Sequence, residues 1–210
     1  MTRGHLLVTG FGPFPGMPRN PSETLARQVG HLGRHGIAGF SVRLMILRTA
    51  YAAIPEMLEP ALAERPAAVL MIGVAGRAKR VRVEARAVNR TSRLFPDVSG
   101  RMPATLSLDR DGPAQRRAPI ADRALVALQN HGVAAIPSVN AGRYLCNASY
   151  FRALGETCPV LFLHIPPAKP GWRRGTRPAI GRRDPSATLA RAVAEVGRRM
   201  LVAARRQTPA

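Results

Sequence analysis

The chain has 210 residues and a hydrophobic content of 46%, enough for a single domain over residues 1–210 with a sizeable core. No apolar run is long enough to span a bilayer, and the apolar stretch at the N-terminus is too short for a secretory signal. The net charge of +20 is almost entirely arginine and could attract polyanions, but it is scattered and lacks the aromatic interleaving of single-strand binders, which leaves nucleic-acid binding as a minor alternative.

The N-terminal segment predicts a strand, a turn and a helix in succession. Residues 6–9 form the first expected strand, and a turn rich in glycine and proline follows at 10–16. A helix then begins at Asn20, which can cap it, while Pro21 and Glu23 occupy favourable positions in its first turn. Its expected apolar face is formed by Leu25, Val29 and Leu32.

The next elements continue the alternation of strand and helix. A second strand is expected over 40–47, followed by a helix over 50–64 that Pro55 and Pro60 bend or shorten. The continuous apolar run at 68–72 is typical of a strand that is buried on both faces.

The central part of the chain predicts more strands around a long loop. Apolar and charged residues alternate over 81–87, which indicates a half-exposed strand, and 90–118 reads mostly as loop. A helix is expected over 119–131. Two further strands are expected over 134–139 and 160–165.

The C-terminal part predicts a basic loop over 167–184, long enough to act as a lid, and a helix over 186–203. The alternation of strands and helices predicts an α/β fold, with an open, mostly parallel sheet between helices. In such folds, sites gather at the carboxyl ends of the strands. The turn at 10–16, Cys146 and His164 all follow predicted strands.

Cys146 and His164 are the candidate nucleophile and base. Cys146 lies where a turn opens into a helix, and backbone N–H groups at a helix start stabilise a thiolate and can hold an oxyanion. His164 ends an apolar run and could accept the thiol proton and return it to a leaving amine. A buried inert cysteine and an unrelated histidine are the plain structural alternative.

A third group normally orients the imidazole of such a pair, and Glu84 is the acid that we choose. Its alternative is a solvated ion pair, because it lies between Arg82 and Arg86 on a strand. The turn at 10–16 lacks the residues of a phosphate loop, so its aromatic residues suit an apolar pocket, with core packing as the alternative. These aromatic residues are Phe11 and Phe14.

The remaining cysteine and histidines indicate no further chemistry. Cys158 is expected to be structural, and two cysteines in total indicate no disulfide framework and fit a reducing cytoplasm. The other histidines show no metal-ligand spacing and are expected at the surface: His5, His31, His35 and His131.

Several segments in the same order resemble the signatures of the pyroglutamyl peptidase I family, also called pyrrolidone-carboxylate peptidases. They span nearly the whole chain, and their combination is specific. The segments are VTGFGPFPG from Val8 with Asn20-Pro-Ser, Gly73–Arg77, Glu84 with Ala87-Val-Asn89, AGRYLCN ending at Asn147, FLHIP from Phe162, and Asp184-Pro-Ser186.

The resemblance implies an α/β/α fold and a cysteine exopeptidase that hydrolyses the N-terminal pyroglutamyl–X bond of peptides through a thioester acyl-enzyme. The family's triad falls on Glu84, Cys146 and His164. No cofactor is expected, and the resemblance implies a homo-oligomer, either a tetramer or a dimer. The substrate-binding positions that it implies are Phe11, Phe14, Asn20, Val74, Tyr144 and Leu145.

The chain also departs from the family pattern, more in the pocket than in the triad. Val74 stands where the family usually has Gln, Arg77 replaces a second Gly, Leu94 aligns with a common Arg, and Gly12 occupies an acidic position. Two alternatives to the peptidase therefore remain: a related thiol hydrolase with an altered substrate or weak activity, and a basic nucleic-acid-binding protein on the same fold.

Overall fold

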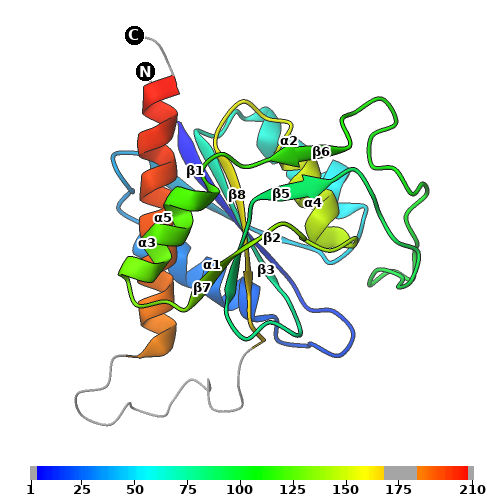
Figure 1. The fold of residues 1–210 in the computed structure, drawn as a ribbon, viewed down its shortest axis with the longest axis horizontal. Coiled ribbons are helices and arrows are strands. Elements are labelled where there is room, and N and C mark those ends of the chain that lie inside the picture. The colour runs from blue at the N-terminus through cyan, green and yellow to red at the C-terminus, as the bar shows by residue number, and fades with distance from the viewer. Residues whose placement is uncertain (1–3, 168–183, 208–210) are drawn as a thin grey trace.

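A computed structural model describes residues 4–167 and 184–207 (Figure 1). Six strands form one sheet in the order β2-β1-β3-β8-β4-β7, in which β4 runs antiparallel to β8 and all other neighbours are parallel. The expected α/β fold with a mostly parallel sheet is therefore confirmed. The strands are β1 His5–Phe11, β2 Ser41–Leu47, β3 Ala68–Val74, β4 Val81–Glu84, β7 Ala135–Ser138 and β8 Val160–Ile165.

Helices cover both faces of this sheet (Figure 1). One layer consists of α1 Pro21–Leu32, α3 Ala121–Asn130 and α5 Pro185–Gln207. The other consists of η1 Ile54–Leu58, a π-helical turn, with α2 Glu59–Ala63 and α4 Leu145–Ala153. A separate two-stranded antiparallel sheet lies beside α4 and consists of β5 Arg86–Val88 and β6 Gln115–Arg117.

The helix expected after the first turn is α1, and Asn20 is its N-cap residue as predicted. The Asn20 Oδ1 atom accepts hydrogen bonds from the backbone N–H of Ser22 at 3.0 Å and from its hydroxyl at 2.8 Å. The Asn20 amide also donates to the Gly12 carbonyl at 2.8 Å, which ties the helix start to the turn after β1. Of the expected apolar face, Leu25 and Val29 are buried, whereas Leu32 at the end of α1 is 45% exposed and does not join the core.

Two expectations about the middle of the chain need correction. The strand expected over 81–87 ends at Glu84, and β5 begins two residues later in a different sheet. Glu84 itself is fully buried, because β4 lies between β8 and β7 and the second helical layer covers this part of the sheet. The long loop expected over 90–118 also contains β6, which pairs with β5.

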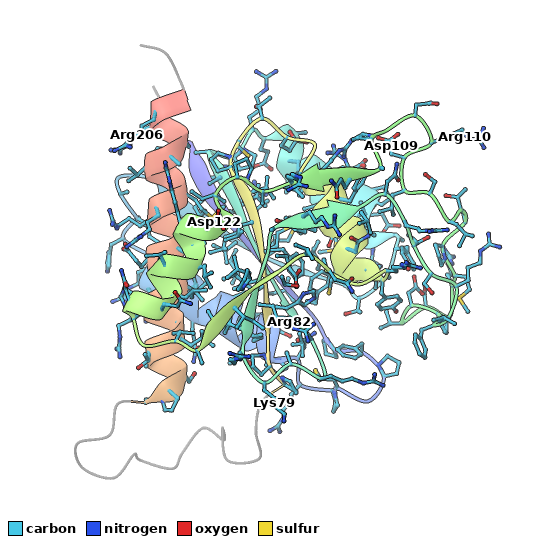
Figure 2. All side chains as sticks on the ribbon, in the orientation of Figure 1. Lys79, Arg82, Asp109, Arg110, Asp122 and Arg206 are labelled. Carbon is cyan, nitrogen blue, oxygen red and sulfur yellow. The ribbon has the colours of Figure 1, made fainter. Side chains whose placement is uncertain are left out.

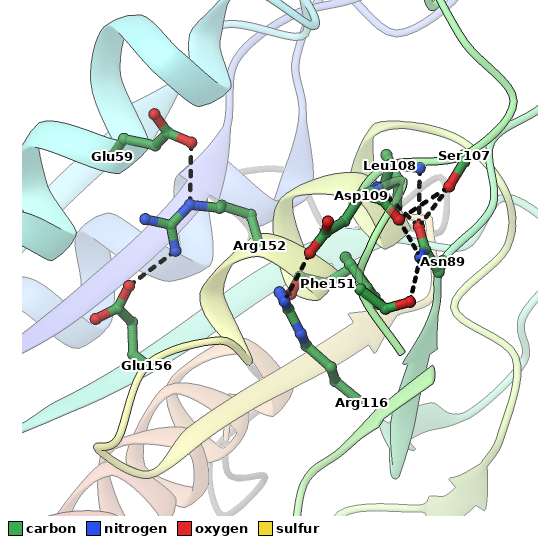
Figure 3. A network of polar contacts seen from close by, with 10 residues as sticks. Glu59, Asn89, Ser107, Leu108, Asp109, Arg116, Phe151, Arg152 and Glu156 are labelled. Atoms are coloured by element: carbon green, nitrogen blue, oxygen red, sulfur yellow. Dashed lines mark hydrogen bonds and ion pairs between the residues drawn. The ribbon is translucent and has the colours of Figure 1, made fainter. Parts of the chain in front are cut away.

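The segment between β5 and β6 is held by polar contacts to itself and to α4 (Figure 3). Asn89 Oδ1 accepts hydrogen bonds from the backbone N–H groups of Leu108 and Asp109, both at 2.9 Å. Arg116 donates to the Phe151 carbonyl at 2.9 Å and to the Asp109 carboxylate at 3.1 Å, with its guanidinium over the Phe151 ring. These contacts anchor the segment against α4, the helix that carries Cys146.

The C-terminal expectations are tested only in part. The helix expected over 186–203 is present as α5, whereas the lid-like loop expected over 167–184 lies almost entirely outside the described residues. Within the described ranges, no helix combines the length and apolarity that crossing a bilayer requires.

Candidate active site

Glu84 and His164 are joined across two neighbouring antiparallel strands. His164 lies at the end of β8 with 5% of its surface exposed, and its Nδ1 atom is 2.8 Å from Glu84 Oε1. Because a carboxylate only accepts, Nδ1 carries the proton of this bond, and Nε2 is left for a second partner. The solvated ion pair that was the alternative for Glu84 is therefore wrong: its carboxylate pairs with His164 inside the protein.

Cys146 is the second residue of α4, which follows the extended cap residue Tyr144. The first backbone N–H groups of a helix have no hydrogen-bond partner within the helix, so those at the start of α4 are free to bind a group that lies in front of it. Across from the sulfur lies Gly73, the β3 residue that pairs in register with His164. A Cβ atom at Gly73 would lie 3.1 Å from Cys146 Sγ and 2.7 Å from Phe162 Cζ. The bare glycine therefore lets α4 bring the thiol down onto the strand beside His164.

The electrostatics of His164 favour its charged form. Burial alone would lower its pKa, but the neighbouring Cys146 and the Glu84 carboxylate, which accepts a hydrogen bond from the ring, raise the pKa to about 9. The imidazole is therefore placed to accept the thiol proton, and that transfer would leave a thiolate beside an imidazolium. This arrangement can attack a carbonyl carbon and then deliver a proton to the departing group.

Residues around Glu84, His164 and Cys146 hold these three side chains in place. The Tyr150 hydroxyl donates to the Glu84 carbonyl at 2.7 Å, which fixes the end of β4. The Asn147 side chain accepts from Val88 N at 2.9 Å and donates to the carbonyl oxygens of Val88 at 2.8 Å and Arg90 at 3.0 Å. These bonds tie the first turn of α4 to β5 and to the residue that follows two positions after it. The helix start that carries Cys146 is therefore held by β5 as well as by its close contact with Gly73 on β3.

The two phenylalanines predicted for a pocket occupy different environments. Phe11 is buried at the end of β1, with its ring centroid 6.3 Å from that of Phe162, whose ring is in turn 4.7 Å from the His164 ring. Phe14 is half-buried in the following turn, where it pairs with Met17. Phe11 therefore packs in the core with only the Phe162 ring between it and His164, whereas Phe14 lies on the turn after β1.

The other predicted substrate-binding residues lie at the same edge of the sheet. Val74 ends β3, where it pairs with Ile165, and Leu145 is the buried first residue of α4. The Tyr144 hydroxyl donates to the Pro96 carbonyl at 2.8 Å. The polar atoms of Asn20 are engaged by Gly12 and Ser22, as described above, so Asn20 positions the turn.

Comparisons with known proteins identify the family of the chain. The sequence model of the family described as Pyroglutamyl peptidase matches residues 4–174. The chain belongs to the pyroglutamyl peptidase family. A pyrrolidone-carboxylate peptidase of Chromobacterium violaceum is 35% identical over 164 residues, 77% of each chain. One from Streptomyces coelicolor is 34% identical over an alignment that covers 100% of this chain and 94% of that protein.

Solved structures of pyroglutamyl peptidases share the fold. The pyrrolidone carboxyl peptidase of Thermus thermophilus has a TM-score of 0.77 at 32% identity, covering 92% of this chain and 98% of that one. The enzyme from Thermococcus litoralis has a TM-score of 0.79 at 25% identity, covering 96% and 94%.

The structural roles of two residues of the site could not be predicted from the sequence. Gly73 and Asn147 occur in the family-like segments, but their packing and tethering roles depend on contacts between distant elements. In the described ranges no group of three or more metal-binding side chains is placed to hold an ion. Cys158 is a free thiol, and His5 is half-buried instead of lying at the surface as expected.

Proposed function

We propose that the protein is a cysteine exopeptidase that hydrolyses the N-terminal pyroglutamyl–X amide bond of peptides. The observation that carries this proposal is the placement of His164 between the Glu84 carboxylate and the Cys146 thiol, at the carboxyl edge of the sheet. Membership of the pyroglutamyl peptidase family supports the choice of substrate.

The reaction follows from the three side chains. The Cys146 thiolate attacks the carbonyl carbon of the pyroglutamyl residue, and N–H groups at the start of α4 stabilise the oxyanion. The His164 imidazolium then donates its proton to the amide nitrogen, the C–N bond breaks, and a thioester remains on Cys146. The neutral imidazole takes a proton from water, whose oxygen attacks the thioester. The second tetrahedral intermediate collapses with cleavage of the C–S bond, which releases pyroglutamic acid and leaves the Cys146 thiolate beside the protonated His164.

The pocket that we propose suits an uncharged, compact lactam ring. Phe11, Phe14 and Leu145 would supply apolar contacts, with Val74 and Tyr144 at its sides, and Asn20 would hold the turn in place. Apolar walls with a few oriented polar groups are the usual composition of a small-molecule pocket. No charged side chain is needed to hold the ring.

A fluorogenic pyroglutamyl amide tests this function. The wild type should release the fluorophore, and Cys146→Ala should lose the activity by roughly 1,000-fold or more because no covalent intermediate can form. Cys158→Ala is the matched control, because it removes the chain's other free thiol and should leave the rate near that of the wild type. Equal rates for Cys146→Ala and the wild type would refute the proposal.

The second candidate is a related thiol hydrolase with a different acyl group, which the departures at Val74 and Leu94 favour. It predicts that iodoacetamide alkylates Cys146 rapidly in a protein that does not cleave the pyroglutamyl amide. Nucleic-acid binding would instead show salt-sensitive retention on DNA with an unreactive Cys146. Arg110 and Arg206 lie on opposite sides of the molecule, both away from Lys79 and Arg82 (Figure 2), and this separation does not favour nucleic-acid binding.

We further propose that residues 1–210 form one domain that assembles as a homo-oligomer in the cytoplasm. The free thiols of Cys146 and Cys158 support a reducing compartment. Apolar side chains exposed within a short segment support self-association, since contiguous exposed apolar surface usually marks an interface. They are Leu94, Phe95, Val98, Met102 and Leu106.

A further inference from the structure

Tyr51 differs from the other two tyrosines of the chain in having a buried hydroxyl without a partner. The Tyr144 hydroxyl donates to the Pro96 carbonyl and the Tyr150 hydroxyl to the Glu84 carbonyl. The Tyr51 oxygen is shielded from solvent, and none of the described residues forms a hydrogen bond with it. A buried donor without a partner destabilises the folded protein, so its presence calls for a physical reason.

The backbone of Tyr51 is fixed at the edge of the sheet where the site lies. Tyr51 follows β2, whose last residue, Leu47, pairs in register with Phe11. Two residues before Tyr51, the Thr49 hydroxyl donates to the Gly12 carbonyl at 3.1 Å, which joins this segment to the phenylalanine-bearing turn. The Tyr51 N–H donates to the Asp97 carboxylate at 2.9 Å. The hydroxyl is therefore held in a defined place and is not on a free loop.

The ring of Tyr51 faces the start of α4. Its centroid is 5.8 Å from that of Tyr144 in an edge-to-face arrangement, and Tyr144 lies two residues before Cys146. Burial, reinforced by Tyr144 and Asp97, raises the pKa of Tyr51 to about 12. The phenol is therefore neutral at any working pH and keeps a proton to donate.

The polar atoms of the other pocket residues are already engaged. The Asn20 amide and carbonyl serve Gly12 and Ser22, and the Tyr144 hydroxyl serves Pro96. We propose that the Tyr51 hydroxyl donates a hydrogen bond to the lactam carbonyl oxygen of the pyroglutamyl ring and makes Tyr51 a specificity-determining residue; this inference rests on the proposed function. That oxygen is the atom that distinguishes a pyroglutamyl ring from a prolyl ring. Substrate would then supply the partner that the free protein lacks.

Tyr51→Phe tests the proposal because it removes the hydroxyl and keeps the ring that packs on Tyr144. The KM for the pyroglutamyl amide should rise about 3- to 10-fold with kcat nearly unchanged, as expected for one neutral hydrogen bond to the bound ring. The inhibition constant of 2-pyrrolidone, the bare lactam, should rise by the same factor. The melting temperature without ligand should stay equal or increase, because the variant no longer buries an unmet donor.

Tyr144→Phe is the matched control for stability, because its hydroxyl has a partner, and its melting temperature should fall. A lower melting temperature for Tyr51→Phe, with an unchanged KM and inhibition constant, would show that the hydroxyl is structural and would overturn the inference alone. A wild type that fails to cleave the pyroglutamyl amide would instead overturn the proposed function, and this inference with it.

Discussion

Glu84 shows how strongly the meaning of a single residue depends on its neighbours in space. Between Arg82 and Arg86 it looks like a solvated charge, yet its side chain is fully buried against His164. An ionised carboxylate is buried only when a partner compensates for lost hydration. The hydrogen-bonded imidazolium of His164 is that partner, so each charge offsets the cost of burying the other.

The raised pKa of His164 predicts the alkaline limit of activity. In the proposed mechanism the His164 imidazolium protonates the leaving amine. This charged form is present below a pH of about 9 and is lost as the pH rises through that value. A plot of kcat/KM against pH should therefore fall above about 9. In Glu84→Gln the charge that raises the pKa is missing, so the limit should move to lower pH.

Turnover in Glu84→Gln should also decrease by roughly 100- to 10,000-fold, since an orienting carboxylate in a triad has an effect of that order. Circular dichroism should show that the variant is folded. Unchanged turnover and an unmoved alkaline limit would remove Glu84 from the mechanism.

At the scale of elements, the site depends on the close approach of α4 to β3 at Gly73. This contact joins residues that are 73 positions apart in the chain, and only a missing side chain allows it. Phe162 and His164 lie on the same face of β8, two residues apart, so the sheet presents both toward the helix that carries Cys146.

Gly73→Ala should therefore displace the thiol from His164. The added methyl group would lie within 3.1 Å of the sulfur and 2.7 Å of the Phe162 ring, and one of them must shift. Because small misplacements of reacting groups are costly, we expect kcat/KM to fall at least roughly 10-fold.

The matched control is Gly76→Ala in the following turn, where an added Cβ would meet no atom within 4 Å. That variant should keep the melting temperature of the wild type. If Gly73→Ala retained full activity, the tight contact between α4 and β3 would not be what positions the thiol.

Elements whose signals lie within a short stretch of sequence could be predicted, whereas those that depend on distant strands could not. Asn20 was identified as a cap because its signals, Pro21 and Glu23, lie within one helical turn, and the strands of the parallel core were recognisable as apolar runs. The antiparallel direction of β4 and the break after Glu84 were not, because they depend on which distant strand lies alongside. The three residues of the proposed triad were selected by chemical type and by resemblance, whereas the unpaired hydroxyl of Tyr51 could be identified only from the coordinates.

At the scale of the whole molecule, the exposed apolar segment predicts self-association. Leu94 and Phe95 are 77% and 69% exposed, and they lie on the segment that projects beyond α4 between β5 and β6 (Figure 1). Light scattering should give a mass that is a multiple of 22.6 kDa. The double variant Leu94→Ser with Phe95→Ser should shift the protein toward the monomer mass of 22.6 kDa, because it removes the exposed apolar side chains.

Leu32→Ser is the control for this experiment, because Leu32 is also exposed but lies at the end of α1, outside the segment. It should leave the mass unchanged. A wild type that is monomeric at micromolar concentrations, or a double variant with the wild-type mass, would contradict assembly through this surface.

The central claim is that Cys146 becomes acylated by the pyroglutamyl group with the help of His164 and Glu84. Rapid acid quenching of the wild type during turnover of a pyroglutamyl amide, followed by peptide mass spectrometry, tests this most directly. The account predicts a pyroglutamyl thioester on the peptide that contains Cys146. Continued hydrolysis with Cys146 unmodified at every time point, or with the acyl group on another residue, would contradict it.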